Sequence, residues 1–162
     1  MLEDLNRKIH DLESNIKEIK EAIAAGNSAQ IALEKVIKSL ESAKGWGIWD
    51  MFGGGFLVTA AKHSKLDKAK EQAQHAQRML SVFNRELSDI NLPTDINIEI
   101  GSFVTFADYF LDGLMADWFV QGKIRDSLDK AKDTYNRVNS ILSTLQSRLK
   151  ELNKELDMLK KK

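Results

Sequence analysis

The chain has 162 residues, and its 24 Lys and Arg balance its 24 Asp and Glu, so the formal net charge at pH 7 is zero. This balance provides no overall basic field for nonspecific nucleic-acid binding, and a nucleic-acid partner is not expected. Cysteine is absent, which excludes disulfides and thiolate metal ligands. The amphipathic N-terminus lacks the basic and apolar regions of a signal peptide, so we expect a cytoplasmic protein.

The first predicted element is a helix over about residues 2–43. Its apolar residues recur at alternating steps of three and four, which is the spacing of a coiled-coil seam. An isolated helix with so narrow an apolar stripe is unstable in water, so the pattern also predicts partner helices. The stripe consists of Leu2, Leu5, Ile9, Leu12, Ile16, Ile19 and Ile23 and continues more weakly at Ala32, Val36 and Leu40.

An aromatic and glycine-rich segment follows over about 45–64, with the sequence GWGIWDMFGGGFLVTAAKHS. Its three consecutive glycines permit a sharp turn or a close backbone approach. The second long helix is predicted over about 56–90, and its arm at 65–90 carries a stripe of mostly smaller apolar residues. Pro93 and its polar neighbours end this helix.

Residues 91–101 show a different period. Ile96, Ile98 and Ile100 alternate with polar residues, and this period of two is typical of extended chain. One short strand cannot form a sheet by itself. We therefore predict an extended segment that lies along the helices with its isoleucine side chains buried.

The second apolar segment, about 102–122, precedes a third long helix that is predicted over about 120–160, with its arm at 123–160. Ten of the 12 aromatic residues lie in 46–56 or 103–119. Aromatic side chains bury the largest areas per residue, so the two apolar segments are predicted to meet in one compact aromatic head.

The sequence also indicates an internal repeat. The peptide LDKAK occurs twice, 62 residues apart, and the same shift aligns Asp50 with Asp112 and Ser64 with Asp126. Ser64 and Asp126 are each suited to cap the N-terminus of a long helix. A unit of one apolar segment followed by one long helix is therefore predicted to occur twice.

Together these patterns predict a single all-α domain over 1–162. It would be an elongated antiparallel coiled-coil bundle of about three long helices, with a compact aromatic head formed by the two duplicated apolar segments. The motifs GWGIWDMFGGG, KHS and FADYFLDGLMADWFVQ resemble the paired signatures of a family of uncharacterised bacterial helical proteins. The resemblance covers roughly residues 28–145. It supports the architecture and implies no activity.

Two sets of head residues are candidates for function. Aromatic residues are enriched at binding hot spots, and the interface candidates are Trp46, Trp49, Phe52, Phe110 and Trp118. Carboxylates in apolar surroundings beside a histidine are typical of metal and acid–base sites, although such aspartates also cap helices and stabilise turns. Capping is the preferred interpretation, and the polar residues concerned are Asp50, His63, Asp112 and Asp117.

The expected function is non-catalytic, with no cofactor. The chain would be a structural or adaptor protein that binds a protein partner, or itself as a homodimer, through the head or the arms. The first alternative is a metal-dependent or acid–base enzyme that uses the head aspartates. The second is a membrane-associating helical protein, which is disfavoured because aspartates interrupt both apolar segments.

Overall fold

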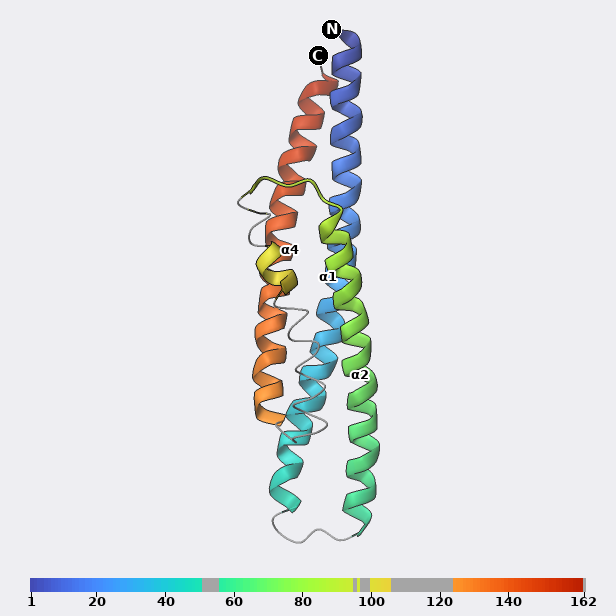
Figure 1. The fold of residues 1–162 in the computed structure, drawn as a ribbon, viewed down its shortest axis with the longest axis vertical. Helices are drawn as coiled ribbons and strands as arrows, with labels where there is room; N and C mark the ends of the chain where they lie inside the picture. Colours follow the sequence, from blue (N-terminus) through green and yellow to red (C-terminus); the bar gives the residue numbers. More distant parts are fainter. Residues whose placement is uncertain (51–55, 95, 97–99, 106–123, 162) are drawn as a thin grey trace.

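A computed structural model describes residues 1–50, 56–94, 96, 100–105 and 124–161, with side chains in 1–42, 67–68, 70–94, 96, 100–105 and 125–161. The chain is all-α, and its described part contains no strand. Its long helices are α1 (Leu2–Asp50), α2 (Phe56–Ser88) and α4 (Ile124–Lys160). Residues 100–105 form a further helical segment beside them (Figure 1).

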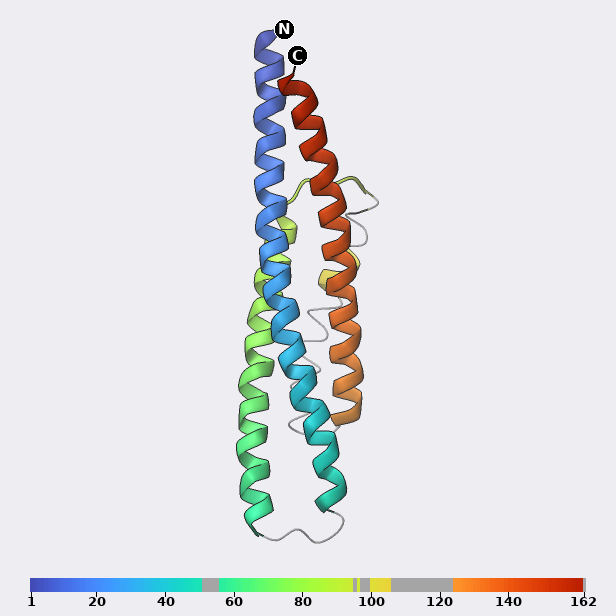
Figure 2. The ribbon, with the colours of Figure 1, turned by 180° about the vertical axis from the view of Figure 1, so that it is seen from behind.

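The three long helices lie side by side, and α1 packs against both α2 and α4. Helices α2 and α4 run opposite to α1, so the N- and C-termini lie at the same end of the molecule (Figures 1 and 2). Near this end, Lys8 Nζ lies 3.1 Å from Glu155 Oε1. Toward the other end, Lys132 Nζ lies 2.9 Å from Glu41 Oε1. These contacts define how α1 and α4 are aligned.

Helix α1 contacts two neighbours because it carries two apolar rows. Beside the stripe from Leu2 to Ile23 lies a row of fully buried small side chains at seven-residue steps, formed by Ala22, Ala29 and Val36. The predicted continuation of the stripe is therefore wrong in part, because Val36 belongs to this second row. The same row continues toward the N-terminus with Asn15 and Lys8, which are polar. An apolar row buries surface against a neighbour, whereas a polar row belongs in water. The second row therefore provides a contact surface for another helix only from Ala22 onward.

The end of α2 coincides with this change in α1. Glu86, near the C-terminus of α2, lines one groove together with Glu21, and α2 ends at Ser88. We call residues 2–21 of α1 with residues 152–160 of α4 the tip, because α2 does not extend along them (Figure 1). The part that includes residues 22–40 of α1 is the middle.

The middle is closely packed around Gly26 of α1. A Cβ atom at this position would lie 2.6 Å from Leu142 Cδ2 and 2.9 Å from Phe83 Cε2. Phe83 also packs on Phe103, with ring centroids 5.8 Å apart and an interplanar angle of 59°, a tilted arrangement that aromatic pairs favour. Glycine at residue 26 therefore allows α2 and α4 to approach α1 at the same level.

The extended segment predicted over 91–101 is wrong in part, because residues 94, 96 and 100–105 are helical. Ile100 and Phe103 are three residues apart in the helical segment 100–105, so they lie on one face of it. Ile100 and Phe103 are buried and Ile96 is partly buried. The alternation of isoleucines fits a strand, but the steps of four and three from Ile96 to Ile100 and Phe103 fit a helix equally well. Ile98 lies outside the described residues.

The predicted helix ends also need correction. Helix α1 continues past 43 to Asp50, so Asp50 lies at a helix C-terminus and does not cap the N-terminus of a helix. Helix α2 begins at Phe56 and passes through Ser64, which therefore does not act as its N-cap. Asp126 lies within the first turn of α4, where a carboxylate interacts favourably with the helix dipole.

The proposed repeat has equivalent buried positions in α2 and α4. The shift of 62 residues aligns Leu80 with Leu142 and Phe83 with Leu145, and all four side chains are buried. It likewise aligns Ala76 with Val138 and Ile90 with Leu152, which are buried as well. The duplication itself stays a prediction.

Most of the predicted aromatic head lies outside the described residues. Its one described aromatic side chain, Phe103, contacts Phe83 of α2. The helical segment 100–105 that carries Phe103 lies near the middle of the bundle (Figure 1). The second apolar segment therefore begins against α2.

Candidate functional site

The site residues predicted from the sequence fall in the part of the chain with the least structural description. Trp46, Trp49 and Asp50 belong to α1, and His63 belongs to α2, but their side chains are not described. The remaining candidates lie outside the described residues: Phe52, Phe110, Asp112, Asp117 and Trp118. Within the described residues, no three His, Asp or Glu side chains form a group that could hold a metal ion.

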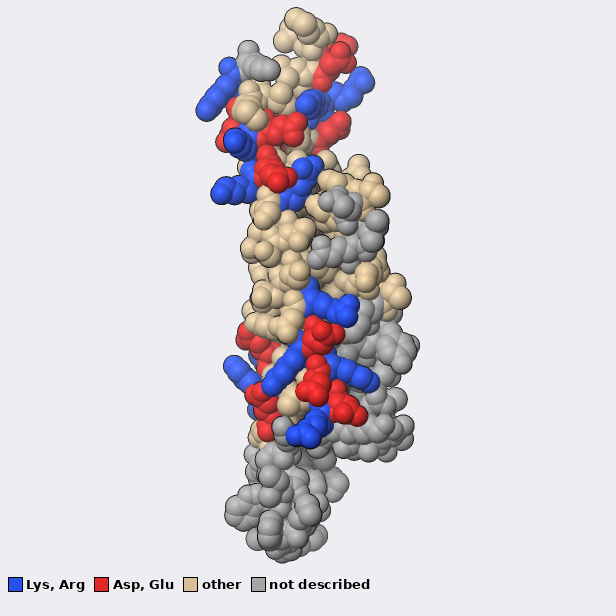
Figure 3. All heavy atoms as spheres, turned by 90° about the vertical axis from the view of Figure 1, so that its left-hand side faces the viewer, with Lys and Arg blue, Asp and Glu red and all other residues tan. Residues whose placement is uncertain are grey.

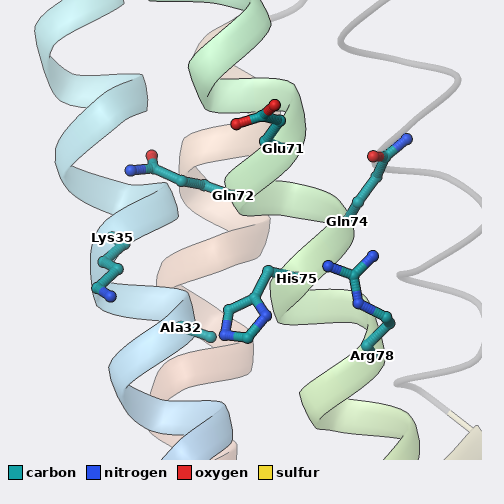
Figure 4. A pocket seen from close by; sticks show the side chains of 7 residues that line it. All are labelled: Ala32, Lys35, Glu71, Gln72, Gln74, His75 and Arg78. Atoms are coloured by element: carbon teal, nitrogen blue, oxygen red, sulfur yellow. The ribbon is translucent and has the colours of Figure 1, made fainter.

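A shallow groove of about 430 Å³ lies between α1 and α2. Figure 4 shows that Gln72 and His75 point toward α1, whereas Gln74 and Arg78 lie on the opposite side of α2. Lys35 lies on the α1 side of the groove. The polar groups therefore do not converge on one point, and this groove has no geometry for catalysis or for selective ion binding.

The contact between α1 and α4 has one closed side and one open side. In heptad notation the seam residues occupy positions a and d. The described d residues of both helices are buried except Leu5 and Leu159, which lie toward the termini and are partly exposed. The buried d residues are Leu12, Ile19, Gly26, Leu33, Leu40, Ala131, Val138, Leu145 and Leu152.

The a residues of the same seam are more exposed. Ile16, Leu128 and Leu142 are buried and Leu2 is exposed, whereas seven a residues are partly exposed, and we call these seven residues the open seam. They are Ile9, Ile23, Gln30, Ile37, Tyr135, Leu149 and Leu156. The difference arises because further elements cover the side of the d residues. The small row of α1 occupies the g positions, which directly precede the a residues, and α2 packs on it. The g residues Ser127, Thr134 and Ile141 of α4 are also buried.

The e residues directly follow the d residues in the sequence and lie beside the a residues on the helix surface. Charged residues at these e positions flank the open seam. Lys160 Nζ donates a hydrogen bond of 2.7 Å to Glu13 Oε1, and Lys132 forms the ion pair with Glu41 described above. The Lys160 ammonium group lowers the pKa of the Glu13 carboxyl group below its usual value, first through this hydrogen bond and then through its charge. Glu13 and Glu41 are four heptads apart, and so are Lys132 and Lys160.

Between these ion pairs the open seam contains a cluster of polar side chains. The Tyr135 hydroxyl donates a hydrogen bond of 3.0 Å to Glu34 Oε1. Gln30 Nε2 donates to Tyr135 Oη at 3.4 Å and to Asn139 Oδ1 at 3.2 Å. The bond to the Glu34 carboxylate raises the pKa of Tyr135, and partial burial acts in the same direction. A polar residue at a single a position, here Gln30, is a common means of fixing the register of helices.

Next to this cluster, each of the long helices has a stretch without charged residues. The uncharged stretches are 22–33 of α1, 79–84 of α2 and 138–147 of α4. Figure 3 shows the α4 side, where a zone without Lys, Arg, Asp or Glu separates two charged zones. Among the exposed residues of the uncharged zone, Ile31 is a large apolar side chain with 56% of its surface accessible.

The open seam was not identified from the sequence, although one signal was present. The row of small residues from Ala22 to Val36 marks the side of α1 that a third helix covers. The opposite side of the seam then carries the e residues. The stripe in the sequence locates the seam, but only this second row distinguishes its two sides.

The comparisons with known proteins give no family for the chain. No protein-family model matches the sequence, and no curated protein or solved structure shows significant similarity to it. The resemblance to a family of bacterial helical proteins therefore stays a prediction. None of the described helices combines the length and apolarity that a membrane-spanning helix requires.

Proposed function

We propose that the chain is a non-catalytic structural or adaptor protein that associates with a protein partner, or with itself, through its long helices. The observation that carries this proposal is the open seam. Apolar side chains at a positions of a coiled coil are normally covered, and Ile23, Ile37 and Leu149 remain partly exposed in a row along two helices. An apolar row bordered by polar residues is typical of an interaction surface.

The other polar groups of the described part of the chain support the same proposal. The contacts between Ser39 and Gln72, between Glu13 and Lys160 and between Tyr135 and Glu34 join one helix to another. Such contacts fix the register of a bundle. They suit a rigid helical surface that presents side chains to another protein.

The test compares the wild type with two matched variants that each add two carboxylates. Ile31→Glu with Asn139→Glu places them beside the open seam. Ser81→Glu with Ser102→Glu places them at exposed positions on α2 and the 100–105 segment. Proteins captured on the wild-type chain are identified and purified, and their binding is then measured by titration, together with self-association by sedimentation.

We expect saturable binding or self-association that the open-seam variant loses and the control variant retains. Circular dichroism establishes that both variants keep the helix content of the wild type. A wild-type chain that neither self-associates nor binds a purified partner saturably contradicts the proposal. Equal loss of binding in both variants contradicts the assignment of the interface to the open seam.

A further inference from the structure

The open seam carries a charge pattern that differs between its two helices. Along the e row of α1, the acidic residues are Glu13, Glu34 and Glu41. Along the e row of α4, the charged residues are Arg125, Lys132 and Lys160, and no acid occurs. One border of the open seam is therefore mainly acidic and the other is basic.

The alignment of the two helices places these residues level with one another. The pairs Glu13–Lys160 and Glu41–Lys132 follow one register, because four heptads separate the pairs on each helix. In the same register Lys20, the one basic e residue of α1, is level with Asn153, which carries no charge. No e residue of α1 is therefore level with a like-charged e residue of α4.

We propose that the open seam binds the open seam of a second copy of this chain, with the two copies parallel and related by a two-fold axis along the bundle. This inference rests on the proposed function and names the partner. The axis places α1 of one copy against α4 of the other. All neighbouring helices among the four are then antiparallel, as in many four-helix bundles.

Charge complementarity selects this arrangement over the antiparallel one. With parallel copies, Glu13 of each copy faces Lys160 of the other, so each carboxylate lies between two ammonium groups. With antiparallel copies, α1 faces α1, which brings Glu13 toward the second copy's Glu41 and Lys160 toward the second copy's Lys132, against one favourable pair, Lys20 with the second copy's Glu34. Like charges placed opposite each other weaken an interface, whereas alternating charges favour the register.

The uncharged zone supplies the centre of the interface. Its exposed Asn27, Ile31, Asn139 and Gln146 carry no charge that association would have to desolvate. Depletion of charged residues at the centre and ion pairs at the borders are the usual composition of a protein–protein interface. The polar cluster around Gln30 and Tyr135 then fixes which heptads of the two copies meet.

The first experiment measures the mass of the full chain by sedimentation equilibrium over a range of concentrations. We expect a mass of about twice the 18.3 kDa of one chain. Glu13→Lys with Glu41→Lys places lysines opposite lysines and should weaken self-association by about tenfold or more. The matched control, Glu3→Lys with Glu18→Lys, reverses two acids on other faces of α1 and should leave the dissociation constant unchanged.

A charge exchange then tests the pairing directly. Lys132→Glu with Lys160→Glu should weaken self-association as well, because glutamates then face glutamates. When this variant is mixed with Glu13→Lys with Glu41→Lys, every border contact between the two copies becomes a pair of opposite charges, while the contacts within each chain pair like charges. We expect the mixture to form a heterodimer with an affinity close to that of the wild type. This rescue cannot result from unfolding of either variant.

The orientation of the copies is measured with a spin label at Ser14→Cys, since the chain has no cysteine of its own. Parallel copies bring the two labels to the same end of the dimer. Antiparallel copies separate them by about 40 Å along the axis, from the rise of 1.5 Å per helical residue. The longer distance would overturn the parallel arrangement.

The remaining outcomes separate this inference from the proposed function. A wild-type monomer at high concentration overturns the inference, and the proposed function then depends on a different protein partner. A dimer that the Glu13→Lys and Glu41→Lys changes do not weaken places the interface elsewhere and also overturns the inference. In that case self-association still supports the proposed function.

Discussion

The middle and the tip of the bundle differ in what covers the seam between α1 and α4. In the middle, Gly26 contacts both Phe83 and Leu142, and α2 covers one side of the seam. At the tip, α2 is absent; Leu12, Ile19 and Leu152 are still buried in the seam, and the ion pairs Lys8–Glu155 and Glu13–Lys160 border its two sides. Exposed ion pairs contribute little compared with buried apolar surface, so local unfolding should begin at the tip.

The largest expected effect comes from removing an aromatic side chain in the middle. Phe83→Ala should lower the free energy of unfolding by about 3–5 kcal/mol, because it empties a fully buried site between α1, α2 and Phe103. Leu156→Ala at the tip should cost only about 1–2 kcal/mol, because this side chain is already partly exposed. Urea unfolding followed by circular dichroism, at one protein concentration, measures both. Equal losses would contradict the distinction between middle and tip.

The next effect concerns the close approach at Gly26. Gly26→Val should destabilise the fold by about 1–3 kcal/mol, because the added methyl groups would overlap Leu142 and the Phe83 ring. Valine is a better helix former than glycine, so propensity alone would stabilise Gly26→Val, and Ala24→Val at an exposed position of the same helix measures the cost of a valine without the overlap. Thermal unfolding measures the stability lost in each of the two variants. If Gly26→Val is as stable as the control, the middle is more loosely packed than described.

A smaller effect depends on the polar cluster of the open seam. Tyr135→Phe removes the hydrogen bond to Glu34 and should cost about 0.5–1.5 kcal/mol at neutral pH. The pKa of Tyr135 is raised in the folded state, so this stabilisation is complete below the usual tyrosine pKa. It is lost as the pH rises through the folded pKa. The stability difference between wild type and Tyr135→Phe should therefore shrink in alkaline solution, and a constant difference would contradict this account.

The smallest effect is expected at the tip. The pKa of Glu13 is lowered by Lys160, so the contact stabilises the fold above the usual glutamate pKa. That contribution is lost as the pH falls through the lowered pKa. Glu13→Gln should reduce the urea midpoint slightly at pH 7 in low salt and have no effect in acid or in 1 M NaCl. An effect that persists in high salt would show that Glu13 acts through packing.

The all-α class and most of each long helix were predictable because their signals are local. Alternating steps of three and four from Leu2 to Ile23 indicate a helix whatever the tertiary contacts of that segment are. Helix ends were harder to predict. Asp50 ends α1 beyond the predicted end at 43, because the expectation treated the aromatic and glycine-rich segment as separate from the helix. Ser64 has the chemistry of a cap, but α2 passes through it.

The spacing of the apolar residues does not show which side of the seam is exposed. Residues at a and d repeat identically in the sequence, yet Ile23 is partly exposed and Ile19 is buried. The difference depends on where α2 packs, which is a tertiary contact. The side of α1 that α2 covers is indicated by the row of small residues at Ala22, Ala29 and Val36. The predicted head sites at Trp49 and Asp112 lie among residues whose side chains are not described, so they stay predictions.

The four-heptad separation of the two border ion pairs has a consequence for the length of the rod. A coiled coil keeps its faces when whole heptads are removed, because each heptad returns the chain to the same side of the helix. Deleting seven residues between Glu13 and Ala22 keeps every face of α1 but shifts Glu13 by one heptad relative to Lys160. Glu13 and Lys160 stay level only if α4 loses a heptad at the same level. The tip should therefore lengthen or shorten only in paired steps of seven residues, each changing its reach by about 10 Å.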